Sequence, residues 1–88
     1  MENLVIYAFS GCLPDTMRKI EWLTECIEKR LVKGQAVTAE HLAESSTIKK
    51  IVSESAKYAQ RFGEMYTKDE KRMARRKIAD KIINDIIL

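Results

Sequence analysis

The chain contains very few of the residues that interrupt helices or carry out reactions. Its 88 residues include three glycines, one proline, two cysteines and one histidine. With so little Gly and Pro, long helices can form without interruption. Cys12 and Cys26 lie far apart and neither belongs to a CxxC pair, so we predict no metal centre. The glycines are isolated from one another and form no phosphate-binding loop, so we predict no cofactor.

No segment is apolar and long enough to be a signal peptide or a membrane anchor. The run Leu4 to Phe9 is short, and Glu2 precedes it instead of Lys or Arg. A signal peptide needs a positive charge before a longer apolar core, and a membrane-spanning helix needs about 20 apolar residues. Two thiols in a chain without a secretory signal suit a reducing compartment. We therefore predict a cytoplasmic protein with no membrane partner.

Composition and periodicity predict one all-α domain over residues 1–88. Hydrophobic residues make up 45% and charged residues 33% of the chain, which is typical of folded proteins. The spacing of apolar residues predicts a compact bundle of three longer helices, over 15–33, 47–62 and 67–87, and a short helix over 39–44. We interpret the apolar residues 4–9 as a further short helix that Gly11 ends, and we expect Gly34 and Gly63 to end the helices over 15–33 and 47–62. A strand over 4–9 is the weaker alternative, because no other segment could pair with it.

The C-terminal helix has the clearest signature. Thr67 and Glu70 have the spacing of a capping box, in which each side chain accepts from the backbone N–H of the other. Four isoleucines form a stripe along its second half: Ile78, Ile82, Ile83 and Ile86. Buried isoleucine contributes roughly 1.5–3 kcal/mol. This stripe must therefore be covered, either by the chain's own core or by a second copy in a homodimer.

The first half of the same helix is basic. Its cations are Lys68, Lys71, Arg72, Arg75 and Arg76. They either lie in solvent at the free start of the helix, or form a surface for an acidic partner or for phosphate. Residues 1–47 carry five Lys/Arg and seven Asp/Glu, whereas residues 48–88 carry eleven and six. The two halves thus have net charges of −2 and +5, which fits self-association and equally fits an acidic ligand.

The helix over 15–33 carries an aromatic residue away from its apolar stripe. The stripe consists of Met17, Ile20, Leu23, Thr24, Ile27 and Leu31. Trp22 points away from it, on the side of Lys19 and Cys26. We favour packing of Trp22 under the N-terminal segment. The alternative is an exposed anchor for a partner protein, because tryptophan is enriched at binding hot spots.

Residues 38–44 resemble the first helix of a helix-turn-helix unit, with an alanine placed to pack on the second helix. The resemblance implies DNA binding, but it covers about a quarter of the chain. The turn holds Ser45, Ser46 and Thr47, where that family has a glycine and an aliphatic residue. The following helix offers lysines, Lys49, Lys50 and Lys57, and no Arg, Asn or Gln near its start to read bases.

No residue pattern indicates a reaction. His41 begins a short helix, and neither cysteine has a local partner that would activate it. We therefore predict a non-enzymatic regulator or adaptor that acts by protein–protein interaction, of the kind by which bacteria and phages modulate a larger enzyme or transcription component. The alternative is a DNA- or RNA-binding regulator. It would use the helix-turn-helix-like segment 38–57 or the basic start of the C-terminal helix.

Overall fold

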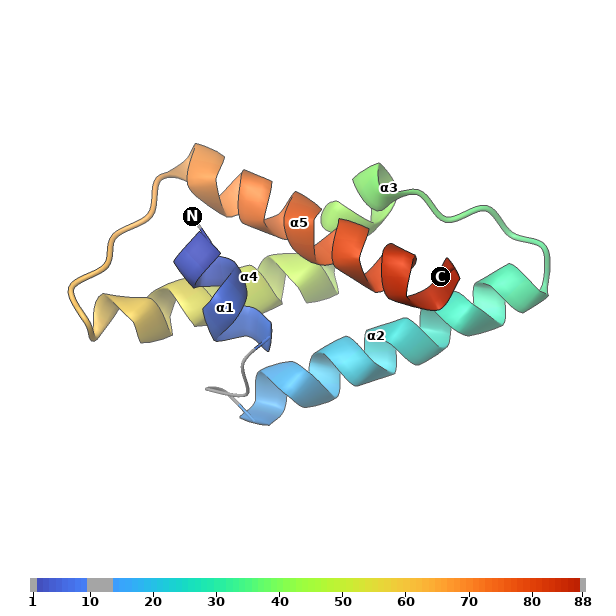
Figure 1. Ribbon diagram of the computed structural model, residues 1–88, viewed down its shortest axis with the longest axis horizontal. Helices are drawn as coiled ribbons and strands as arrows, with labels where there is room; N and C mark the ends of the chain where they lie inside the picture. Colours follow the sequence, from blue (N-terminus) through green and yellow to red (C-terminus); the bar gives the residue numbers. More distant parts are fainter. Residues whose placement is uncertain (1, 10–13, 88) are drawn as a thin grey trace.

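The computed structural model describes residues 2–9 and 14–87, and in these ranges it contains five helices and no strand (Figure 1). The helices are α1 (Glu2–Phe9), α2 (Pro14–Val32), α3 (Ala39–Ala43), α4 (Ser46–Gln60) and α5 (Lys68–Ile87). The predicted all-α bundle is confirmed. The helix predicted over 4–9 is α1, and the strand alternative is wrong. The other predicted bounds differ from the observed ones by at most two residues.

α4 and α5 are the central helices, because each packs against all the others. Figure 1 shows α5 running along much of the molecule's length, with α2 and α4 on one side of it. The molecule measures 43 × 25 × 22 Å. A 20-residue helix spans about 30 Å, so α5 alone covers most of the long axis. The shorter helices α1 and α3 pack on this pair, and α2 lies at the edge.

The core is aliphatic and draws on all five helices. Ile48, Ile51 and Ile78 are completely buried. The other buried hydrophobic residues in this cluster are Leu4, Ala8, Ile20, Leu23, Ile27, Leu42, Ala43, Val52, Ala74, Ala79 and Ile82. Ile83 and Ile86 are partly buried and pack against it. The chain's own helices therefore bury Ile78 and Ile82 and cover Ile83 and Ile86 in part.

Local capping fixes where α4 and α5 begin. The capping box of α5 forms as predicted: the Thr67 N–H donates to Glu70 Oε1 and the Glu70 N–H donates to Thr67 Oγ1, both at 3.1 Å. Ser45 caps α4, since its hydroxyl accepts from the Ile48 N–H at 3.3 Å. The helix therefore starts at Ser46, one residue before the predicted position.

Two glycines end α2 and α4 in the same way. Gly34 and Gly63 both have φ of 79°, which L-residues with side chains rarely adopt. After α2, the Gly34 N–H donates to the Leu31 carbonyl and the Gln35 N–H donates to the Arg30 carbonyl, both at 3.0 Å. These paired bonds form a Schellman motif, and the same pattern recurs at Gly63. Gly11, which we expected to end the first helix, lies outside the described residues.

The buried side of α2 differs in part from the predicted stripe. Ile20, Leu23 and Ile27 are buried, whereas Met17, Thr24 and Leu31 are only partly covered. Thr16, absent from the predicted stripe, is completely buried. Its hydroxyl, like that of Ser55 on α4, has no hydrogen-bond partner in the described chain. These two hydroxyls are therefore unsatisfied polar groups in an otherwise apolar core.

Candidate interaction surfaces

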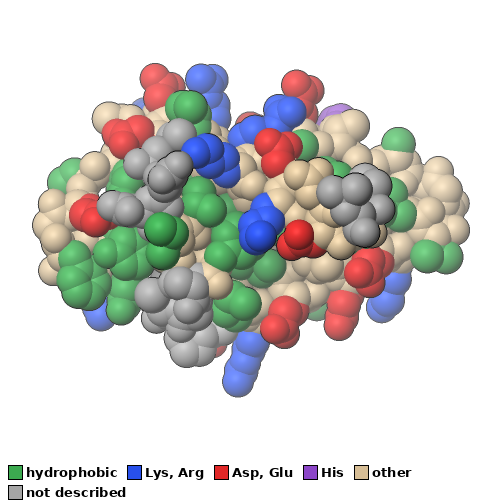
Figure 2. Space-filling view, viewed as in Figure 1, with side chains coloured by type: hydrophobic (Ala, Val, Ile, Leu, Met, Phe, Trp, Pro, Cys, Tyr) green, Lys and Arg blue, Asp and Glu red, His purple; other side chains and the backbone are tan. Residues whose placement is uncertain are grey.

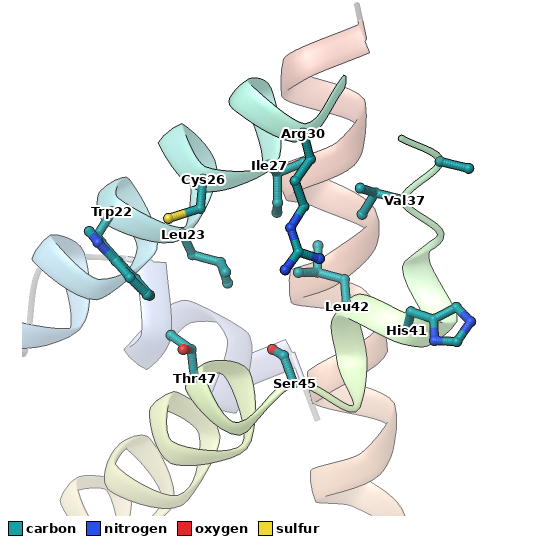
Figure 3. A pocket seen from close by; sticks show the side chains of 11 residues that line it. Trp22, Leu23, Cys26, Ile27, Arg30, Val37, His41, Leu42, Ser45 and Thr47 are labelled. Carbon is teal, nitrogen blue, oxygen red and sulfur yellow. The ribbon is translucent and has the colours of Figure 1, made fainter. Parts of the chain in front are cut away.

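A groove of about 500 Å³ lies between α2 on one side and α3 with the start of α4 on the other (Figure 3). It exists because the described residues of α2 and α3 do not pack against each other, although both helices pack against α5. Its floor is apolar and well covered: Leu23, Ile27 and Leu42 are at most 8% exposed. The floor therefore belongs to the hydrophobic core, seen through an opening between two helices.

Trp22 lies at one end of the groove and is 57% exposed (Figure 3). Our favoured expectation, that it packs under the N-terminal segment, is wrong. Its side chain instead lies over the space between α2 and α4, beside Cys26 and facing Thr47 across the groove. The sequence correctly placed Trp22 away from the core-facing stripe of α2. It could not show that no other helix covers that side.

Arg30 extends across the other end of the groove. Figure 3 shows its side chain reaching from α2 toward Leu42 on α3. It has no ion-pair or side-chain hydrogen-bond partner among residues 2–9 and 14–87. No other Lys or Arg, and no Asp or Glu, lines the groove among those residues. The groove thus joins an apolar floor to one unpaired positive charge.

Cys26 and His41 line opposite walls of the same groove. In Figure 3 the Cys26 sulfur points toward Trp22, and the His41 ring points away from the groove. The two side chains are therefore not arranged as a nucleophile and its base. Cys12 lies outside the described residues. Within those residues, no group of three or more His, Cys, Asp or Glu side chains is placed to hold a metal ion.

The five cations at the start of α5 differ in how far their side chains are buried. Lys71 and Arg75 are partly buried, and Lys68, Arg72 and Arg76 are exposed. The Nε of Arg75 is buried without a hydrogen-bond partner in the described chain. The stems of Lys71 and Arg75 lie along the protein, and the other three side chains extend into solvent.

The same cations also differ in whether they form ion pairs. Arg76 bridges two carboxylates, Glu40 on α3 at 3.6 Å and Asp80 on its own helix at 3.3 Å. Arg72 lies 3.8 Å from Asp69. Lys68, Lys71 and Arg75 have no ion-pair partner among the residues that the structure describes. Arg76 is thus a contact between α5 and α3, and the unpaired cations are the ones available to an acidic ligand.

Lys57 and Lys71 line a concave surface of about 260 Å³ between α4 and α5. Neither lysine has an ion pair in the described chain, whereas Lys49 pairs with Glu44 at 3.2 Å. Sequence reasoning had assigned Lys57 and Lys71 to different surfaces. Their proximity depends on how α4 crosses α5, which no local pattern encodes.

Aromatic side chains form a further exposed cluster. The rings of Tyr7, Tyr58 and Phe62 have centroids 5.5–6.1 Å apart, and Phe62 is 62% exposed. Figure 2 shows hydrophobic side chains gathered at the end of the molecule that holds α1 and the end of α4. Phe62, just after the end of α4, therefore brings this aromatic cluster to the surface.

Comparisons of this chain with protein-family models, with curated proteins and with solved structures found no match. Among the described residues, no helix combines the length and the apolar character needed to cross a bilayer. The groove beside Trp22 and the surface around Lys57 and Lys71 are the candidate binding surfaces.

Proposed function

We propose that this chain is a small, non-enzymatic regulator or adaptor that acts in the cytoplasm by binding another protein. The observation that carries the proposal is the position of Trp22, 57% exposed at the end of an open apolar groove. Because the Trp22 ring is large and exposed, a partner that covers it removes apolar surface from water, which favours binding. Tryptophan in such pockets contributes more to binding than most interface residues.

The test compares what the tagged protein and two variants capture from cells that naturally express the chain. Trp22→Ala removes the exposed ring, and Val32→Ala is the matched control because Val32 is 87% exposed on the same helix but does not line the groove. We expect the wild type and Val32→Ala to retain a common protein. Hot-spot truncation costs about 2 kcal/mol or more, so Trp22→Ala should bind it about 30-fold more weakly. Equal retention by all three folded proteins would contradict the proposal.

Nucleic-acid binding is the second candidate, favoured by the pair of unpaired lysines at the α4–α5 surface. Lys57 and Lys71 could contact neighbouring phosphates, with Lys68 and Arg75 nearby on α5. Such binding should show as a mass increase in light scattering with a random DNA duplex at low salt. It should weaken steeply as salt rises. Lys71→Glu should abolish it, and Lys77→Glu, on the outer side of the same helix, should weaken it only slightly.

The same light-scattering measurement reports self-association. A dimer is compatible with the proposal, because the partner protein can include a second copy of the chain. It would not use Ile78 and Ile82 as a seam, since both are at most 2% exposed in the single chain. A dimer whose mass does not increase when DNA is added would favour the interaction protein over the nucleic-acid binder.

A further inference from the structure

The groove beside Trp22 has the shape of a site for a helix. Along α2 its wall is formed by residues 22, 23, 26, 27 and 30, which recur at helical spacing. At 1.5 Å per residue this wall is about 12 Å long, or roughly two turns. The facing wall comes from α3 and the start of α4. A long opening between two helices with an apolar floor is the geometry into which an amphipathic helix lays its apolar face.

The positive charge at the groove favours an acidic amphipathic helix over a basic one. Arg30 reaches into it without a partner in the described chain, and no described carboxylate lines it. The N-terminus of α4, capped by Ser45, opens on the same space and adds the partial positive charge of its helix dipole. Arg30 is exposed, and an Arg guanidinium pairs with a carboxylate through charge-assisted hydrogen bonds. A basic helix would be repelled by the same groups.

The chain's own surface helices do not fit this description. The exposed stripe on the outside of α2 carries Glu21, Glu25 and Glu28, but it offers no row of apolar side chains to fill the groove. A nucleic acid would need several cations for its phosphates, and among the described residues Arg30 is the one Lys or Arg that lines the groove. We infer that the occupant is an amphipathic helix of another protein, with apolar residues on the groove floor and Asp or Glu beside Arg30. This inference rests on the proposed function and names the chemistry of its partner.

The test uses the intact chain and two synthetic helical peptides that contain no tryptophan. Both carry leucines at helical spacing along one face, flanked by Glu in one peptide and by Lys in the other. Trp22 is the only tryptophan in the chain, so its fluorescence reports occupation of the groove. We expect the Glu peptide to shift the emission to shorter wavelength. An exposed ion pair of this kind supports a preference of up to about fivefold over the Lys peptide.

Variants at position 30 test whether Arg30 causes the preference for the Glu peptide. Arg30→Glu should reverse the order of the two peptides, and Arg30→Gln should bring their affinities close together. Lys77→Glu is the control, because it makes the same charge change at an exposed position on α5 outside the groove. It should leave the preference for the Glu peptide in place. Circular dichroism of each variant checks that the helices are retained, and Arg30→Gln serves if Arg30→Glu does not fold.

Three outcomes would overturn the inference. In the first, both peptides bind equally well to the wild type. In the second, neither peptide shifts the emission of Trp22. In the third, the emission shifts with protein concentration alone, which would show that a second copy fills the groove. The capture experiment with Trp22→Ala is independent of these results. A partner lost with Trp22→Ala beside a failed peptide test would keep the proposed function and reject only this partner chemistry.

Discussion

Lys19 on α2 and Glu54 on α4 form an ion pair in which one ammonium group contacts both carboxylate oxygens. The Lys19 Nζ lies 2.9 Å from Oε1 and 2.8 Å from Oε2. This is the only ion pair between α2 and another helix in the described part of the chain. It lies one turn before Trp22 along α2. The pair therefore links α2 to α4 one turn before the groove.

Breaking this pair should have a small effect on stability. The two side chains are 30% and 36% exposed, so solvent screens much of their attraction. We expect Glu54→Gln to lower the free energy of unfolding by about 0.5–1 kcal/mol, as for other exposed pairs. Urea unfolding of Glu54→Gln, Lys19→Met and the double variant measures the coupling. The coupling should shrink at high salt. A value several times larger would mean that the pair is effectively buried.

Removing the buried hydroxyl of Ser55 should stabilise the protein. Ser55 is completely buried and its Oγ has no hydrogen-bond partner in the described chain. An unsatisfied buried polar group costs about 1–3 kcal/mol, so Ser55→Ala should raise the free energy of unfolding by about 1 kcal/mol. For a domain of this size, that is an increase in Tm of about 4–8 °C. Ser53→Ala is the control, an exposed serine on the same helix that should change little. A destabilised Ser55→Ala would show that the hydroxyl has a partner.

The capping box at the start of α5 should make stability depend on acid pH. Hydrogen bonding from the Thr67 backbone N–H holds the pKa of Glu70 below its usual 4.5. Folding therefore favours the carboxylate, a contribution that is complete above pH 4.5 and lost as the pH falls through the folded pKa. Glu70→Ala should accordingly be less stable than the wild type at pH 7, with the gap closing in acid. Thermal unfolding at several pH values measures this.

The other half of the box can be tested separately. Thr67→Ala removes the hydroxyl that accepts from the Glu70 N–H, and loss of such a cap typically costs about 1 kcal/mol. Thr67→Ser keeps the hydroxyl and should retain most of the stability. If Thr67→Ala and the wild type unfold at the same temperature, the box does not form in solution.

The phenol of Tyr66 should ionise at a higher pH than that of an ordinary tyrosine. Burial, followed by the hydrogen bond to Glu64, raises the pKa of Tyr66 from 10.0 to about 12. Folding therefore favours the neutral phenol, and the stability that this provides is full below pH 10 and lost as the pH rises toward 12. Ultraviolet titration, compared with Tyr66→Phe, isolates this step. Glu64→Gln should lower the pKa, because it removes the charge of Glu64, and should leave it above 10, because burial still raises it. A pKa near 10 in the wild type would contradict this environment.

What the sequence predicted well is local. The capping box of Thr67 and Glu70 and the glycine endings at Gly34 and Gly63 depend on residues within one or two turns, and all three form. The stripe of isoleucines on α5 identified a buried face because apolar periodicity reports which side is covered. It could not report what covers it, and the choice between core and dimer seam required the packing of α1 to α4.

What the sequence did not predict depends on how the helices cross. Trp22 was expected under the N-terminal segment, and it is exposed because α2 stands apart from α3. Arg30 was not predicted to be a contact residue, because one cation near a helix end is common. Its position at the groove depends on the wall formed by α3. Lys57 and Lys71 come together only through the crossing of α4 and α5. Contacts between distant segments carry no local signal.

Photo-crosslinking from position 22 tests the central claim most directly. A photoreactive residue replaces Trp22 in one variant and Lys77 in another, both exposed but only the first at the groove. After irradiation in cells that express the chain, the groove account predicts a discrete product with another polypeptide from position 22 and none from position 77. The same product from both positions, or none from position 22, would contradict it.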